Sequence, residues 1–85
     1  RYVFEPGLTD GGVMVDLMLP DLRRENALVR GTPDADIIAE LAPANGEPVF
    51  DKNRPSALLG TACEAWLQQT GIRQVIVAGV TTSCC

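Results

Sequence analysis

The sequence predicts an α/β domain built on a parallel sheet, and three features of its second half support that prediction. Four consecutive apolar residues, Val75 to Ala78, include three β-branched side chains and are followed by Gly79. A short run of this kind is typical of a strand buried on both faces. Residues 48–50 form another short apolar segment, and residues 56–69 have a helical pattern. Together they predict one βαβ unit with a right-handed crossover, the hand found in about 98% of such units.

The segments before this unit are less regular. We expect residues 1–10 to be irregular, because turn signals occur at residues 6–7 and 10–12. Pro20 is expected to interrupt any regular element. Residues 21–29 are charged and mixed, which favours a solvated turn or a short helix.

Residues 33–41 predict a short helix. Asp34 can cap its N-terminus, and Ile37, Ile38 and Leu41 fall on one face. Asn45-Gly46 predicts a tight turn before the short strand at residues 48–50.

The main helix is predicted over Ser56–Gln69. Thr61 and Glu64 have the spacing of a capping box, although Ser56 can start the helix earlier. Gly71 is suited to the position just after the helix. One face of the helix is apolar and is formed by Leu59, Cys63, Trp66 and Leu67.

Composition narrows the class of protein. The chain has 85 residues, 46% of them hydrophobic and 21% charged, with a net charge of −4, which suits one soluble globular unit. There is no basic excess, so a nucleic-acid partner is disfavoured. No apolar stretch approaches the roughly 20 residues of a membrane span. Three cysteines without disulfide-framework spacing suggest reduced thiols in a cytoplasmic enzyme.

Chain length is short for a complete doubly wound domain. The sequence starts at Arg1 and stops at Cys85, where a helix is expected to follow the last strand. We therefore interpret residues 1–85 as a single, partial domain of a longer protein.

The candidate site follows the predicted strand at residues 75–78. Parallel sheets place their chemistry beyond the carboxyl ends of their strands. That place is occupied here by small hydroxyl and thiol residues, Thr81, Thr82, Ser83, Cys84 and Cys85. A thiol on such a turn is a candidate nucleophile, and the alternative is a buried structural thiol.

Two motifs carry a resemblance to a known family. The segment from Val75 to Cys85 resembles the nucleophile segment of the isochorismatase-like cysteine hydrolases, which include nicotinamidases and N-carbamoylsarcosine amidases. Residues 47–61, with Lys52 followed by Ser56-Ala-Leu-Leu-Gly-Thr61, resemble the family's segment with the catalytic lysine. Leu58 stands where the family commonly has Phe. The resemblance covers roughly residues 34–85. It implies a three-layer α/β/α, Rossmann-like fold, of which this chain covers only part.

The resemblance implies a catalytic role for Cys85 and Lys52. Cys85 matches the nucleophile by its spacing from Thr81, and Cys84 matches a variable position that we interpret as core-facing. Lys52 would stabilise the thiolate and the developing oxyanion, and the alternative is a surface lysine beside Asp51. The family's catalytic Asp has only a weak candidate here, Asp16.

We prefer to interpret Asp16 as a solvated turn carboxylate. Only 35 residues lie between it and Lys52, too few for the strands and helices that the family places there. We expect the Asp to lie in sequence outside this chain. Arg23, Arg24 and Arg54 are candidates for binding an anionic substrate, although a solvated face is the preferred interpretation.

The resemblance also implies an oxyanion hole made by the backbone N–H groups of Thr81 and Cys85. In the family the peptide bond before the first Thr of the pair is cis, so the bond between Val80 and Thr81 is predicted to be cis. The alternative is that Thr81 and Thr82 are ordinary turn residues that cap a following helix.

These features predict a cysteine hydrolase that cleaves a C–N bond of a small amide or carbamoyl substrate through a thioester. The alternatives are an isochorismatase-type vinyl-ether hydrolase, which does not need the cysteine, and a non-catalytic α/β scaffold. The chain has no His, so the metal site of nicotinamidases has no visible ligands, and we expect no cofactor and no metal. The predicted partners are a small-molecule amide and further copies of the same chain in a homo-oligomer, with no nucleic acid and no membrane.

Overall fold

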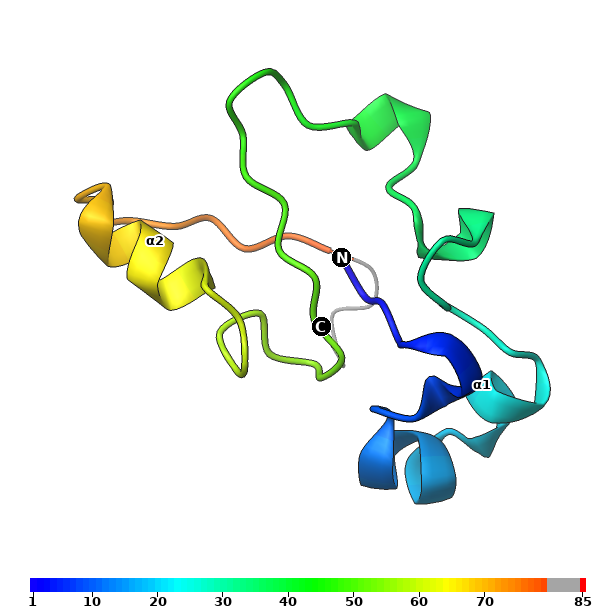
Figure 1. Cartoon of the computed structure of the whole chain (residues 1–85). Coiled ribbons are helices and arrows are strands. Elements are labelled where there is room, and N and C mark those ends of the chain that lie inside the picture. The colour runs from blue at the N-terminus through cyan, green and yellow to red at the C-terminus, as the bar shows by residue number, and fades with distance from the viewer. Residues whose placement is uncertain (80–84) are drawn as a thin grey trace.

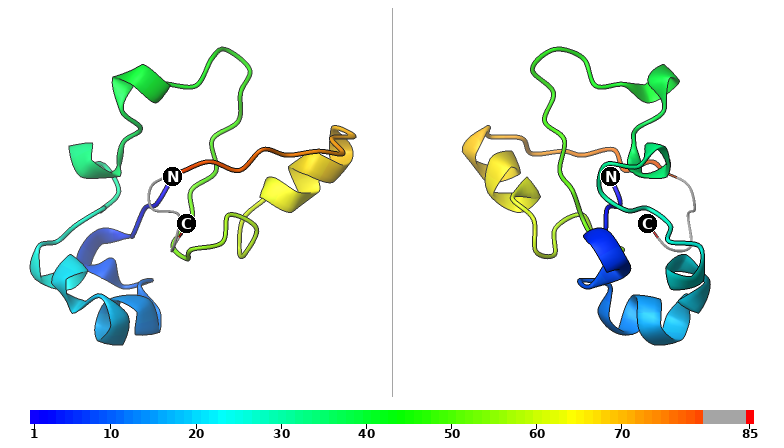
Figure 2. Two further views of the ribbon diagram at one scale, coloured as in Figure 1. Left: turned by 180° about the vertical axis from the view of Figure 1, so that it is seen from behind. Right: turned by 45° about the vertical axis from the view of Figure 1, so that its right-hand side comes forward.

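The computed structural model describes residues 1–79 and residue 85, and its regular structure consists of short helical elements (Figure 1). In chain order these are the 3₁₀ turn η1 (Pro6–Leu8), the π-helical turn η2 (Met14–Met18), α1 (Pro20–Arg24), the 3₁₀ turns η3 (Pro33–Ala35) and η4 (Ala39–Leu41), and α2 (Cys63–Gln69). α1 and α2 lie on opposite sides of the molecule (Figure 2), which extends 40 × 26 × 22 Å.

Three extended segments from distant parts of the sequence run parallel to one another at the centre. Tyr2 forms a parallel bridge with Lys52, and Phe4 forms one with Val29. Backbone hydrogen bonds of 2.8–2.9 Å close both pairings: Lys52 N–H to Arg1 O, Val3 N–H to Lys52 O, Phe4 N–H to Leu28 O and Arg30 N–H to Phe4 O. Residues 2–4 therefore lie between the other two segments.

The expectation of an irregular N-terminal segment is wrong for residues 2–4. Tyr, Val and Phe are side chains that favour an extended, half-buried backbone, and here that backbone is bonded on both edges. The turn signal at residues 6–7 is correct, since η1 starts at Pro6 and Gly7 has a φ of 76°.

The core is small and lies in the first third of the chain. Phe4, Leu8, Val15 and Val29 form one buried cluster, and Tyr2, Leu22 and Leu28 pack against it. Both η1 and η2 contribute a buried residue to this cluster, and α1 packs beside η2. η2 ends at Met18 and Pro20 begins α1, so Pro20 lies at a break between two helical elements, as expected. α1 is the short helix, one of the two structures expected for residues 21–29.

The predicted strand at residues 75–78 is not formed, and this is the main correction to the predicted fold. Ile76 is 97% exposed and Val77 is 80% exposed. Residues 48–50 are likewise extended without being a strand, and the bridge forms two residues later, at Lys52. A strand needs a bonded neighbour, and the described residues supply none to residues 75–78.

The main helix is shorter than predicted. Residues 56–62 form turns and bends, with Gly60 at a φ of 70°, and α2 begins only at Cys63. The N-cap residue is Ala62, with no side-chain capping bond, so the predicted Thr61–Glu64 capping box is not formed; Thr61 Oγ1 instead accepts a hydrogen bond of 3.2 Å from the Cys63 N–H.

The end of α2 is as predicted. Gly71 has a φ of 70° and its N–H donates to Gln68 O, while the Ile72 N–H donates to Leu67 O. This pair of bonds is a Schellman motif. Trp66 attaches the helix to the centre of the molecule, because its ring lies 6.1 Å from the ring of Phe50.

The helix predicted over residues 33–41 is also wrong, because the segment contains two separate 3₁₀ turns. Asp36 between them is extended, with φ −81° and ψ 154°. The Asp34 carboxylate does not cap a helix here; it accepts hydrogen bonds from the Leu28 N–H and from the Thr32 hydroxyl. The tight turn at Asn45-Gly46 is present, with Gly46 at a φ of 89°.

Within residues 1–79 and 85, no helix has the length and apolar character needed to cross a bilayer.

Candidate active site

Lys52 is held at both its backbone and its ammonium group. Its backbone pairs with the Tyr2 segment, as described above. Its Nζ donates a hydrogen bond of 2.6 Å to Pro55 O and lies 5.0 Å from the centre of the Tyr2 ring. Both contacts hold the ammonium of Lys52 in one place.

A polar cavity of about 150 Å³ adjoins Lys52. Its lining combines two cations with three carboxylates, and the residues are Val3, Glu5, Asp10, Arg30, Asp51, Lys52, Asn53 and Gly60.

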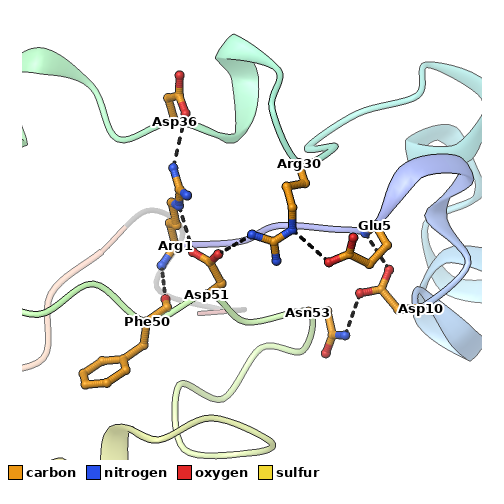
Figure 3. Close-up of polar contacts among 8 residues, drawn as sticks. All are labelled: Arg1, Glu5, Asp10, Arg30, Asp36, Phe50, Asp51 and Asn53. Atoms are coloured by element: carbon orange, nitrogen blue, oxygen red, sulfur yellow. Dashed lines mark hydrogen bonds and ion pairs between the residues drawn. The ribbon is translucent and has the colours of Figure 1, made fainter.

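Ion pairs fix much of this lining, as Figure 3 shows. Asp51 bridges two arginines, with 2.8 Å to Arg1 Nε and 2.8 Å to Arg30 Nη1, and Arg30 Nε lies 2.8 Å from Glu5. The hydrogen bond from Arg1, together with that from Arg30, lowers the pKa of Asp51 against the opposing effect of burial. Asp51 therefore pairs with the arginine that directly precedes residues 2–4 and with Arg30 of the neighbouring segment.

Asp10 joins this region to the loop after Lys52. Its two carboxylate oxygens accept hydrogen bonds of 2.9 Å from the Glu5 N–H and 2.9 Å from Asn53 Nδ2 (Figure 3). Burial raises the pKa of Asp10, but these hydrogen bonds and the charge of Arg54 outweigh it and hold the pKa below its usual value. The sequence marked Asp10 only as part of a turn, because a contact between residues 10 and 53 leaves no local pattern.

Cys85 lines a different cavity, of about 310 Å³, which is mainly apolar. Its thiol is free and exposed. The same cavity is lined by residues 55–58, Cys63, Leu67, Val75 and Val77. Cys63 and Leu67, which lie on the helix face predicted to be apolar, are half-buried there.

Pro55 connects the two predicted catalytic residues. Its carbonyl accepts the hydrogen bond from Lys52, and the residue also lines the cavity of Cys85. Lys52 and Cys85 nevertheless line separate cavities.

Thr81 and Cys84, the predicted oxyanion-hole and core-facing residues, lie outside the described residues. The same holds for Thr82 and for the bond between Val80 and Thr81, so the predicted cis geometry stays a prediction.

The remaining candidates have other surroundings. Asp16 is exposed and forms an ion pair of 2.6 Å with Arg23, as expected of a solvated carboxylate. Arg24 pairs with Asp21 on the surface. Arg54 is half-buried, contrary to the solvated face we expected, and its Nη1 donates to Asp10 O at 3.0 Å.

Comparison with known proteins supports the resemblance. The isochorismatase domain model matches residues 13–85, which is most of the chain. The chain belongs to the isochorismatase family. Membership implies the α/β class, while the three-layer sheet itself stays a prediction.

The relatives it resembles are amide-cleaving enzymes by name. The maleamate amidohydrolase of Pseudomonas putida is 35% identical over 80 residues, which is 94% of this chain and 36% of the relative. The N-carbamoylsarcosine amidase of an Arthrobacter species is 45% identical over 51 residues, 60% of this chain and 19% of the relative. A ureidoacrylate amidohydrolase of Acinetobacter baylyi is 34% identical over 58 residues, 68% of this chain and 24% of the relative.

The chain thus spans between 19% and 36% of the length of these relatives. No solved structure matches it.

Proposed function

We propose that the protein containing this chain is a cysteine hydrolase that cleaves a C–N bond of a small amide or carbamoyl compound. The observation that supports this most directly is the free, exposed Cys85 thiol. It lies at a cavity that is also lined by Pro55, and the carbonyl of Pro55 binds the Lys52 ammonium. The named activities of the maleamate and N-carbamoylsarcosine relatives agree with it.

In the proposed reaction the Cys85 thiolate attacks the substrate carbonyl carbon, forming a C–S bond. The C–N bond then breaks, and the nitrogen takes up the proton that the Cys85 thiol gave up on becoming a thiolate and leaves as ammonia or an amine. Water then adds to the thioester: its hydroxyl goes to the acyl carbon, which releases the carboxylic or carbamic acid, and its other proton goes to sulfur. The Lys52 ammonium stabilises negative charge, first on sulfur and then on the carbonyl oxygen.

Two other functions compete with this one. A vinyl-ether hydrolase of the isochorismatase type does not need a cysteine, so an exposed thiol at the cavity disfavours it. A scaffold domain would carry Cys84 and Cys85 as packing thiols of ordinary, equal reactivity.

The test is ammonia release from N-carbamoylsarcosine, ureidoacrylate and maleamate by the full-length natural protein. We expect turnover of at least one of them and its loss in Cys85→Ser, because a hydroxyl in that place lacks the nucleophilicity of a thiolate. Cys84→Ala is the matched control and should keep most of the activity.

Two results would contradict the proposal. Activity that survives Cys85→Ser but is lost in Cys84→Ala would place the nucleophile one residue earlier. An absence of turnover on all three compounds, with thiols that are uniformly slow toward iodoacetamide, would favour the scaffold.

A further inference from the structure

We propose that Asp10 is a positioning residue for Lys52. Its carboxylate holds the loop of residues 53–55, whose Pro55 carbonyl receives the Lys52 ammonium. The inference rests on the proposed function, because it assumes that Lys52 acts on Cys85.

The first step is the fixation of the Asp10 carboxylate. One oxygen accepts from the backbone N–H of Glu5 and the other from Asn53 Nδ2, both at 2.9 Å. Glu5 directly follows the fully buried Phe4, the last residue of the central paired segment. With both oxygens bonded, the carboxylate is fixed in position and in rotation, and so is the amide of Asn53.

The second step is the contact with Arg54. Its Nη1 donates to Asp10 O at 3.0 Å and to Asn53 O at 2.7 Å. Gly12 leaves room for this guanidinium, since a Cβ at Gly12 would lie 2.8 Å from Arg54 Nη2. The turn at residues 10–12 therefore contacts both residues that follow Lys52, through a side-chain pair and through a backbone carbonyl.

The third step leads from the loop to the ammonium. Pro55 directly follows Arg54, and its carbonyl lies 2.6 Å from Lys52 Nζ. A lysine side chain is flexible and stays in one place only when its ammonium has a fixed partner. Displacing residues 53–54 would move that carbonyl, and the Lys52 ammonium would lose its bond to Pro55, the residue that lines the cavity of Cys85.

A purely structural role for Asp10 would change stability without changing the thiol. The readout is therefore the alkylation rate of Cys85 relative to Cys63 in the same molecule. We would measure both with iodoacetamide, by peptide mass spectrometry of the full-length natural protein carrying Cys84→Ala. The proposed function predicts that Cys85 reacts at least about tenfold faster than Cys63, because only a stabilised thiolate reacts quickly. Lys52→Met should reduce the ratio to near one.

The decisive variants reverse the Asp10–Asn53 pair. Asn53→Asp places two carboxylates face to face, so repulsion should open the contact and lower the ratio by about tenfold. Combining it with Asp10→Asn restores an amide–carboxylate pair with the donor on the other side. The double variant should return to within about twofold of the parent ratio.

Controls separate positioning from unfolding. Circular dichroism checks that each variant is folded, and Asp16→Asn removes a surface carboxylate elsewhere and should leave the ratio unaltered. If Asn53→Asp does not fold, Asn53→Ala, which deletes the amide without adding charge, decides the matter and should lower the ratio by about threefold.

The outcomes distinguish the two proposals. A high parent ratio that is unchanged in folded Asn53→Asp or Asn53→Ala, or that the double variant fails to restore, overturns the role of Asp10 alone. A parent ratio near one, unchanged by Lys52→Met, overturns the proposed function and this inference with it.

Discussion

Residues 1–52 and residues 55–79 carry similar apolar side chains but differ in what surrounds them. In the first region Phe4 and Val15 are completely buried, although no helix there exceeds one or two turns. In the second region Leu59, Val75 and Ile76 are mostly exposed, although it contains the longest α-helix described. Burial of apolar side chains in this molecule therefore depends on the paired backbone segments and the side chains packed around them. The length of the nearby helix contributes little to that burial.

Truncating one apolar side chain in each region tests this difference in burial and should give the largest change in the free energy of unfolding. Phe4→Ala should lower the free energy of unfolding by about 3–5 kcal/mol, because it leaves a cavity in the core. Ile76→Ala should change it by less than about 0.5 kcal/mol, since the side chain is 97% exposed. Urea unfolding of the full-length natural protein measures both. A large cost for Ile76→Ala would instead show that residues 75–78 form the buried strand predicted from the sequence.

Replacing one glycine by alanine in each region should give a smaller difference in stability. A Cβ at Gly11 would lie 2.6 Å from the Cβ of the buried Val15, whereas one at Gly79 meets nothing within 4 Å. Gly11→Ala should therefore cost about 1–3 kcal/mol through overpacking. Gly79→Ala should be neutral or slightly stabilising. Equal thermal shifts in the two variants would contradict the contrast between the regions.

The smallest effect is the dependence of stability on pH, which we expect to come from the first region. Asp10, Asp34 and Asp51 all have a pKa below the ordinary value of 3.8 in the folded protein. Their contribution to stability is complete above that ordinary value and is lost as the pH falls through the lower folded values. Urea midpoints measured from about pH 6 to about pH 2 should fall in acid.

Two variants test whether Asp51 accounts for the loss of stability in acid. Asp51→Asn should flatten the acid side of the profile, because Arg1 and Arg30 then lose their carboxylate. Ile76→Ala removes no titrating group and should leave the shape of the profile unchanged. An acid profile that is identical in both variants would remove Asp51 from the explanation.

Local signals in the sequence predicted local structure. Gly71 ends α2 as expected because the left-handed backbone of a Schellman motif depends on one residue and its near neighbours. The paired segment at residues 2–4 was missed because three residues are too few to show alternation. The run at residues 75–78 predicted a buried strand, but a strand also needs bonded neighbours, which a local pattern of side chains does not supply and the described residues do not provide.

The candidate site was predictable only in part. Lys52 and Cys85 were predicted as catalytic residues through a resemblance to a family, which stays a prediction; Lys52 bonds Pro55, and Pro55 lines the cavity of Cys85. Asp10 and Asn53 were not identified, because their hydrogen bond joins positions 43 residues apart. The half-buried state of Arg54 was missed for the same reason, since its partner is the backbone carbonyl of Asp10.

The order of the three paired segments has a consequence for how the chain is made. Residues 2–4 occupy the middle place but are synthesised before both of their neighbours, residues 28–30 and residue 52. A ribosome adds about 5–20 residues per second, so the second edge of the middle segment stays unpaired for about 3–10 s. During that interval its N–H and C=O groups and the Phe4 side chain are open to other chains. Pairing of residues 2–4 cannot be completed until Lys52 has emerged from the ribosome. We therefore expect this region to fold late and to be most sensitive to aggregation before that point.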